Sequence, residues 1–195
     1  KANSEKLNNI FFINTCAVTK EAENQAKKKI RKIKRENPEA KIIVTGCSAQ
    51  INPKDYKKMN EVDLILGNEE KFKFKKYLNL LNNNSPEIVV NNIMSVKETA
   101  NHFIKGFDKK ARAFVQIQTG CDHRCTFCII PFGRGNSRSV PIMKICNQIK
   151  ILLEKGFKEI VLTGVDLTSY GNDLYEKPKL GKLIKEILKK IKNLE

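Results

Sequence analysis

The sequence predicts an α/β protein in which a small parallel α/β domain is followed by the start of a second parallel sheet or (β/α) barrel. Two patterns support this fold class. Short, continuous apolar runs alternate with longer segments in which apolar residues recur every three or four positions. The runs are typical of strands covered on both faces, and the longer segments are typical of amphipathic helices. With 195 residues, 41% of them hydrophobic, the chain can bury a core of its own.

The first domain is expected over residues 1–81. It begins with a strand at Asn9–Ile13, and a helix follows that has Thr19 as its N-cap and ends before Pro38. The remaining elements are the strands Lys41–Thr45 and Val62–Leu66 and a helix at about 69–81. Because strands and helices alternate, the strands are expected to run parallel.

A linker is expected over residues 82–110, with one buried strand at Glu87–Val90, and a second domain over residues 111–195. The second domain begins with a strand in which Ala113, Val115 and Ile117 face one side. The later elements are a helix capped by Ser139 with Pro141 at its first position and ending at Gly156, a strand at Glu159–Thr163, and a helix from Leu180 to Ile191. The cysteine-rich loop at 120–128 then follows a parallel strand, where active sites gather.

Charge and cysteine content narrow the function classes. The chain has 37 Lys and Arg against 21 Asp and Glu, a formal charge of +16 that favours a polyanionic partner such as nucleic acid, although composition bias explains the charge equally well. Six unevenly spaced cysteines are too few for a secreted disulfide scaffold, and no apolar run is long enough to cross a membrane. We therefore expect a cytoplasmic protein in which a tight cysteine cluster is a metal or redox site.

Such a cluster is present at Cys121, Cys125 and Cys128, with the spacing C-x3-C-x2-C. Three thiolates on one loop can hold three irons of a four-iron cluster, whereas structural clusters take four cysteines. The fourth iron is left open to chelate the amino and carboxylate groups of S-adenosylmethionine and to pass an electron to its sulfonium. A zinc site with His123 as fourth ligand is the alternative, but zinc sites generally draw on paired Cys or Cys/His units, and no second pair is nearby.

The segment Gly120–Ser139, GCDHRCTFCIIPFGRGNSRS, resembles the cluster loop of the radical S-adenosylmethionine methylthiotransferases. The segments NTCAVT and TGC, which contain Cys16 and Cys47, resemble the accessory domain of that family. The resemblance implies a second four-iron cluster ligated by three cysteines, of which Cys16 and Cys47 match two. The third would lie before Lys1, and we expect the chain to be a fragment. Without the resemblance, both cysteines would more often be small buried hydrophobes, and Cys146, on the apolar face of its helix, is expected to be a core residue.

The resemblance also implies contacts to the S-adenosylmethionine cofactor at six weaker positions. Phe127 matches the aromatic residue near the adenine, although packing within the loop is an equal alternative. The other five are Ser137, Arg138, Gly164, Val165 and Asp166. No catalytic residue is expected beyond the ligands of the two clusters.

The reaction implied by the family replaces an unreactive ring C–H bond with a methylthio group. The segment GVDLTSYG, residues 164–171, is most similar to the branch that acts on threonylcarbamoyladenosine beside the tRNA anticodon. The alternatives are the isopentenyladenosine branch, the branch that modifies an aspartate of a ribosomal protein, and a non-enzymatic metal-binding module that recognises nucleic acid. The expected partners are tRNA and an electron donor of the flavodoxin or ferredoxin type, and we expect a monomer with no membrane contact.

Overall fold

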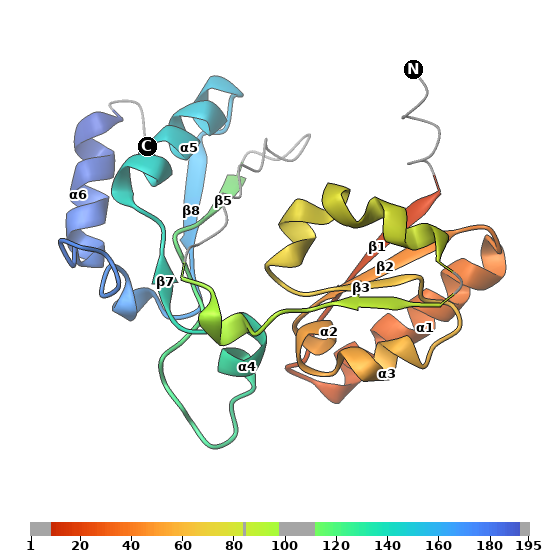
Figure 1. The fold of residues 1–195 in the computed structure, drawn as a ribbon. Helices are drawn as coiled ribbons and strands as arrows, with labels where there is room; N and C mark the ends of the chain where they lie inside the picture. The colour runs from red at the N-terminus through yellow and green to blue at the C-terminus, as the bar shows by residue number, and fades with distance from the viewer. Residues whose placement is uncertain (1–8, 84, 98–111, 192–195) are drawn as a thin grey trace. The chain divides into compact units, whose positions relative to one another are not determined.

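The structure, a computed structural model, describes residues 9–83, 85–97 and 112–191. They form two compact units (Figure 1). Unit 1 comprises the chain up to Val96 together with Arg124–Gly135, and unit 2 comprises Lys97–His123 together with Asn136–Glu195. Each unit is built on a parallel pair or sheet of strands, which confirms the predicted fold class.

Unit 1 contains a four-stranded parallel sheet in the order β1-β2-β3-β4. Its strands are β1 (Ile10–Thr15), β2 (Lys41–Gly46), β3 (Leu64–Leu66) and β4 (Glu87–Val89). The first three confirm the predicted strands to within two residues. The fourth was expected inside a linker, but it pairs along its whole length with β3. Its place in the sheet depends on pairing with β3, which is remote in sequence, and local periodicity does not predict such pairing.

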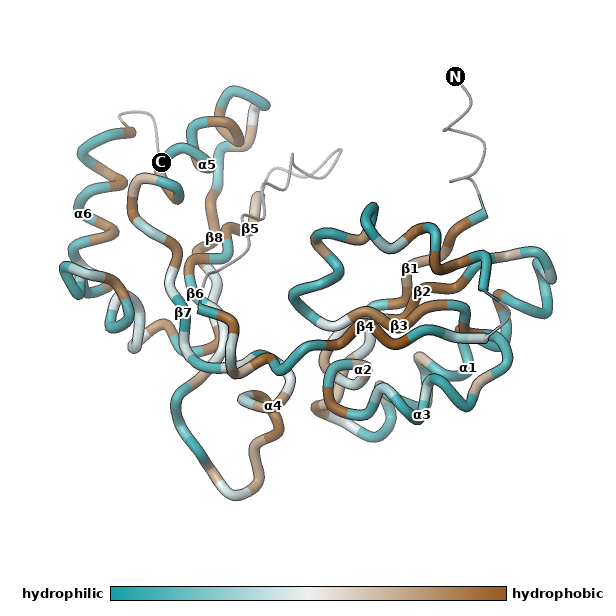
Figure 2. The backbone as a smooth tube through the Cα atoms, viewed as in Figure 1, coloured by the Kyte–Doolittle hydropathy of each residue, from teal (hydrophilic) through white to brown (hydrophobic). Residues whose placement is uncertain are grey.

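The strands of this sheet are coloured mostly as hydrophobic in Figure 2. Because successive side chains of a strand point to opposite sides, a continuous apolar run makes both faces of the sheet apolar. Ile42 and Val44 of β2 pack in one cluster with Ile30 and Ile33 of the first helix. Ile43, between them, packs in a second cluster on the other face. This two-sided burial is the reason that the sequence of β2 is a continuous apolar run.

One face of this sheet is covered by α1 (Lys20–Glu36) and by two short helices that the sequence analysis did not predict, α2 (Cys47–Ile51) and α3 (Pro53–Lys57) (Figure 1). The Oγ1 atom of Thr19 accepts a hydrogen bond from the Ala22 N–H at 3.2 Å, so the predicted N-cap is confirmed. The opposite face carries the segment η2 (Glu70–Asn82).

The predicted helix at 69–81 is wrong in type, because η2 is a 3₁₀ helix interrupted by non-helical backbone at Lys73. Phe74, Tyr77 and Leu81 of this segment still pack on the sheet. The apolar spacing therefore predicted correctly that this segment has a buried face. The same spacing does not distinguish the tighter 3₁₀ turn from the α-helical turn.

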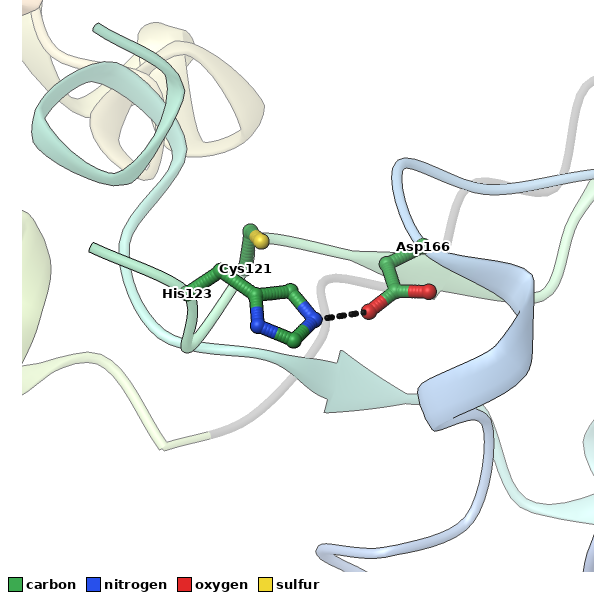
Figure 3. Close-up of side chains that lie close together, drawn as sticks. All are labelled: Cys121, His123 and Asp166. Carbon is green, nitrogen blue, oxygen red and sulfur yellow. Dashed lines mark hydrogen bonds and ion pairs between the residues drawn. The ribbon is translucent and has the colours of Figure 1, made fainter. Parts of the chain in front are cut away.

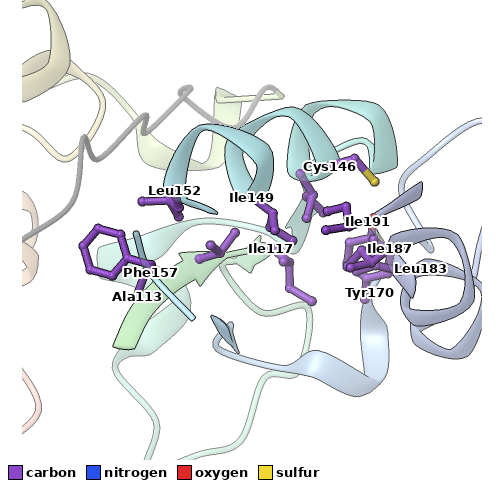
Figure 4. Packing of buried hydrophobic residues seen from close by; sticks show 12 residues of the cluster. Ala113, Ile117, Cys146, Ile149, Leu152, Phe157, Tyr170, Leu183, Ile187 and Ile191 are labelled. Atoms are coloured by element: carbon purple, nitrogen blue, oxygen red, sulfur yellow. The ribbon is translucent and has the colours of Figure 1, made fainter. Parts of the chain in front are cut away.

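Unit 2 is built around two parallel strands, β5 (Arg112–Gln116) and β8 (Glu159–Thr163), which pair in register. The helices α5 (Ile142–Glu154) and α6 (Leu180–Lys190) contribute Ile149, Leu152, Leu183 and Ile187 to one apolar core with Val115 and Ile117 (Figure 4). The strand predicted from Ala113 is interrupted after Gln116, and β6 (Gln118–Thr119) pairs instead with β7 (Arg138–Ser139) in an antiparallel ladder.

The predicted N-cap of α5 is wrong. Pro141 occupies the cap position and Ser139 belongs to β7, where its Oγ atom accepts a hydrogen bond from the Gly171 N–H at 2.8 Å. A backbone donor far along the chain therefore takes the hydroxyl that we expected to cap the helix. Gly156, with a φ of 86°, follows the end of α5 as predicted.

The structure divides the chain differently from the expected domains. The strand β4 and the turn η3 (Ile93–Ser95) lie within unit 1, and residues 98–110 of the expected linker lie outside the described residues. The segment Arg124–Gly135, expected in the second domain, packs in unit 1 because its short helix α4 (Ile130–Arg134) contacts α2. Within the described ranges, no helix has both the length and the apolar character that crossing a membrane requires.

Candidate functional site

Two cysteines follow neighbouring strands at the carboxyl edge of the sheet in unit 1. Cys16 directly follows β1, and Cys47 directly follows β2. The last residues of these strands, Thr15 and Gly46, are register partners in the parallel ladder. Since paired strands lie about 4.8 Å apart, the two thiols begin from neighbouring positions. Two soft thiol donors on neighbouring strand ends suit an iron-sulfur cluster or zinc.

Gly46 permits the close approach of the two strand ends. It has a φ of 99°, and a Cβ atom at this position would lie 2.2 Å from the Thr15 carbonyl oxygen. The Thr15 hydroxyl links the same strands, donating to the Thr45 carbonyl at 2.7 Å and accepting from the Ala49 N–H at 3.1 Å. The backbone between Cys16 and Cys47 is therefore fixed by short-range contacts across the strand ends.

Two segments, the turn after β3 and the helix α4, contact the half-buried side chain of Cys47. Asn68, just beyond β3, donates from Nδ2 to Cys47 Sγ at 3.7 Å, and Arg134, in α4, donates from Nε to the same sulfur at 3.3 Å. A Cβ atom on Gly133 would lie 2.9 Å from the Cys47 Cβ, so α4 packs directly against this cysteine. Asn68 and Arg134 were not predicted from the sequence, although the position of Asn68 after a parallel strand was a usable signal.

The three cysteines of the C-x3-C-x2-C motif are divided between the units. Cys125 and Cys128 lie in unit 1 on one turn, in which the Cys128 N–H donates to the Cys125 carbonyl at 3.0 Å. Cys121 belongs to unit 2 and follows Gly120, whose φ is 74°. Their joint role as ligands therefore stays a prediction from spacing. Phe127, inside the turn, is 90% exposed, so packing within the loop does not account for it.

Cys121, His123 and Asp166 lie close together in unit 2 (Figure 3). One ligand atom of each lies within 4.8 Å of the other two, and His123 Nε2 is 3.1 Å from Asp166 Oδ2. The Ser169 and Thr168 hydroxyls and then His123 hydrogen-bond the Asp166 carboxylate and lower its pKa to about 2. His123, the fourth ligand of the zinc alternative, therefore has a carboxylate partner in this structure.

Gln118 joins the segments around this group, and the sequence analysis did not identify it. Its fully buried amide accepts from the N–H groups of Val165 and Asp166 at 2.8 and 2.9 Å. The side-chain amino group, Nε2, donates to the carbonyls of Thr119 and Gly120 and to the Ser137 hydroxyl. One amide thus connects the residues before Cys121 to the loop after β8.

Four of the predicted cofactor-contacting residues gather around Gln118. A Cβ atom on Gly164 would lie 3.0 Å from Gln118 Oε1, and Val165, Asp166 and Ser137 bond to its amide. Arg138, the fifth, is buried next to Ser137 rather than solvated. These residues share one end of the β5–β8 pair, but their contact with a cofactor stays a prediction.

Cys146 differs from the other cysteines. It is 1% exposed within the apolar core of unit 2, and burial raises the pKa of its thiol (Figure 4). This burial confirms the prediction that Cys146 is a core residue. A neutral buried thiol is also a poor metal ligand.

Comparison with known families gives two matches. Residues 1–67 match the model described as Uncharacterized protein family UPF0004, and residues 115–195 match that of the Radical SAM superfamily. The second match covers the C-x3-C-x2-C motif. The resemblance predicted from the cysteine segments is therefore confirmed.

Individual relatives are named as tRNA-modifying enzymes. The threonylcarbamoyladenosine tRNA methylthiotransferase MtaB of Rickettsia prowazekii is 56% identical over 189 residues, covering 97% of this chain and 44% of the relative. The protein of the same name from Aquifex aeolicus is 42% identical over 87% of this chain and 42% of the relative. A tRNA-2-methylthio-N(6)-dimethylallyladenosine synthase of Clostridium tetani is 34% identical over 95% of this chain and 42% of the relative. The chain spans less than half the length of these relatives.

Proposed function

We propose that this chain, a homologue of the radical S-adenosylmethionine methylthiotransferases, forms the cluster-bearing part of an enzyme that methylthiolates threonylcarbamoyladenosine beside the tRNA anticodon. One observation carries the proposal: the chain combines a three-cysteine loop with two further cysteines at paired strand ends. A single cluster would not need the second pair. Relatives named for this nucleoside reach 56% identity, against 34% for a relative named for dimethylallyladenosine.

The radical cluster would be held by Cys121, Cys125 and Cys128. The donor set fits, because three thiols within eight residues leave one iron without a protein ligand. When bound, such a cluster supplies an electron to S-adenosylmethionine and so starts radical chemistry at a C–H bond. A flavodoxin or ferredoxin type of protein would supply that electron.

The residues around Gln118 would orient the cofactor. The amide of Gln118 holds the backbone of Val165 and Asp166 in place, and the His123–Asp166 pair ties the cysteine loop to the same segment. Ser137, Arg138 and Gly164 complete this end of the strand pair, and the exposed ring of Phe127 would pack on the adenine. Fixed backbone groups position a bound molecule without further reorganisation.

The second cluster would be held by Cys16, Cys47 and a third cysteine that the family resemblance implies before Lys1. The pairing of Thr15 with Gly46 supports this assignment, because Cys16 and Cys47 each follow one of these paired residues. This cluster would carry the sulfur that enters the product.

A tRNA substrate agrees with the charge of the chain. The exposed face of α1 carries Lys28, Lys29, Arg31, Lys32 and Arg35. Arg31 and Lys32 are partly neutralised by Glu61 and Glu36, but both pairs are exposed and therefore weak. A basic surface of this kind attracts the phosphate backbone without reading sequence. Action on tRNA agrees with the expected cytoplasmic location.

Anaerobic reconstitution of the full-length enzyme tests the proposal. We expect about eight iron and eight sulfide per chain, cleavage of S-adenosylmethionine under reductant, and methylthio-threonylcarbamoyladenosine in digested tRNA by mass spectrometry. The double variant Cys16→Ala, Cys47→Ala should keep about half of the iron and the cleavage of S-adenosylmethionine, but should form no methylthio product.

Cys146→Ala is the matched control and should keep both clusters. Product in isopentenyladenosine, or in a ribosomal protein aspartate, would contradict the proposed substrate. Bound zinc with no cleavage of S-adenosylmethionine would contradict the proposed chemistry and favour a metal-binding module.

A further inference from the structure

We propose that Asn68 and Arg134 are positioning residues of the second cluster, which donate to the Cys47 sulfur and raise the reduction potential of the cluster that this cysteine would ligate. The inference rests on the proposed second cluster and names two residues that tune it. Both side chains lie in unit 1 with Cys47, so both contacts are within one unit.

The amide of Asn68 is held so that its amino group faces the sulfur. Lys71 Nζ donates to Asn68 Oδ1 at 2.8 Å, and because an ammonium can only donate, this bond identifies the oxygen end of the amide. The other end, Nδ2, donates to the Gly133 carbonyl at 2.7 Å and to Cys47 Sγ at 3.7 Å. The backbone N–H of Asn68 donates to Gln50 Oε1 at 2.8 Å, which anchors the residue to α2.

The position of Asn68 in the sheet explains why it reaches this sulfur. It follows β3 after one intervening residue, Gly67, while Cys47 directly follows β2, and the two strands are parallel neighbours. The carboxyl edge of the sheet therefore presents Cys16, Cys47 and Asn68 in the order of β1, β2 and β3. Asn68 occupies the position at which the third strand would offer a ligand, but it offers an N–H donor instead.

Arg134 adds a positive charge at the same sulfur. Its Nε lies 3.3 Å from Cys47 Sγ, and the packing of Gly133 against Cys47 sets this distance, because any side chain at Gly133 would push α4 away. Two donors from two different segments thus converge on one thiol.

These contacts have a predictable electrostatic consequence. Hydrogen bonds to ligand sulfurs and nearby positive charge favour the reduced, more negative state of an iron-sulfur cluster. Loss of either donor should therefore make the second cluster harder to reduce. A side chain with a purely structural role would change the amount of cluster without a consistent change in its potential.

The test uses the full-length enzyme with Cys121, Cys125 and Cys128 all replaced by Ala, so that the second cluster alone contributes to the electron paramagnetic resonance signal. Potentiometric titration of this background is compared with the added substitutions Asn68→Leu and Arg134→Gln. Each should lower the ratio of reduced to oxidised cluster at a fixed potential by about tenfold, which equals about 59 mV for a one-electron couple.

The matched controls are Asn24→Leu on the exposed side of α1 and Arg112→Gln, which removes an exposed arginine paired with Glu159. Both should leave the ratio unchanged. A background protein that binds no cluster would refute the proposed second cluster itself. If the background protein binds its cluster normally and both donor variants have unchanged potentials, only the role of Asn68 and Arg134 is refuted. If Asn68→Leu binds no cluster, the potential of Arg134→Gln is the test: a lowered potential supports the proposal, and an unchanged potential refutes it.

Discussion

Each unit has a side-chain amide at the carboxyl edge of its strands, and the two amides have different partners. Gln118 in unit 2 is fully buried and bonds to four backbone groups and the Ser137 hydroxyl. Asn68 in unit 1 is half-buried, and its amide bonds to the Lys71 ammonium, the Gly133 carbonyl and the Cys47 sulfur.

Because their partners differ, we expect the Gln118 amide to support the backbone and the Asn68 amide to adjust a cluster ligand. Removing a buried amide leaves its backbone partners without hydrogen bonds, and each such group costs about 1–3 kcal/mol. Removing a half-buried amide leaves partners that water can reach, so the energetic cost is smaller. We therefore expect Gln118 to determine stability and Asn68 to determine the properties of a cluster.

The largest expected effect is that of Gln118→Leu. The substitution leaves the N–H groups of Val165 and Asp166 and the Gly120 carbonyl unpaired, and it should lower the free energy of unfolding by about 3–6 kcal/mol. Denaturant unfolding of the full-length apo-protein measures the loss, and hydrogen exchange should increase at residues 164–166. Gln116→Leu, at a half-buried position in β5, is the control. Equal losses for Gln118→Leu and Gln116→Leu would contradict the supporting role of the buried Gln118 amide.

The next effect tests whether the edge of unit 1 also depends on backbone geometry. Gly46→Ala places a Cβ 2.2 Å from the Thr15 carbonyl at a φ of 99°, so β1 and β2 must separate where Cys16 and Cys47 follow them. We expect a loss of about 2–4 kcal/mol and a lower content of the second cluster. Gly181→Ala in α6 is the control, because nothing lies within 4 Å of its added methyl group. That variant should be about 0.5 kcal/mol more stable than the unmodified protein. A stable Gly46→Ala protein would show that the strand ends tolerate separation.

A smaller effect on stability is expected for Asn68→Leu. The loss should be about 1 kcal/mol, because Lys71 and the Gly133 carbonyl can be solvated in its place. Thermal unfolding of the apo-protein measures the difference beside Gln118→Leu under the same conditions. A loss as large as that of Gln118→Leu would make Asn68 a structural residue first.

The smallest effect is that of Asp166→Asn, and it depends on pH. The pKa of Asp166 is about 2 in the folded protein against an ordinary value of 3.8, so its ionised form stabilises the fold above pH 3.8. This contribution is lost as the pH falls toward 2. We expect Asp166→Asn to cost about 1 kcal/mol or less at neutral pH, and its unfolding midpoint to approach that of the unmodified protein near pH 2. Asp55→Asn on α3 is the control, and a difference that does not change with pH would contradict the assignment.

The sequence by itself determined the elements that local periodicity encodes. Apolar runs and amphipathic spacing depend on neighbouring residues, so β1, β2, β8, α1 and α6 were predicted close to their observed bounds. The placement of Cys16 and Cys47 after two parallel strands follows from the same local patterns. The C-x3-C-x2-C motif and its chemistry were also available from spacing alone, together with the family resemblance.

The tertiary structure alone decided which distant segments complete each site. The pairing of β4 with β3, the packing of Gly133 on Cys47 and the bonds of Asn68 and Gln118 join residues that are far apart in the chain. Ser139 illustrates the physical reason, since its hydroxyl had a suitable local role as a cap but bonds instead to Gly171. Polar groups near a buried edge take the partners that folding brings to them, and a local pattern does not encode those partners.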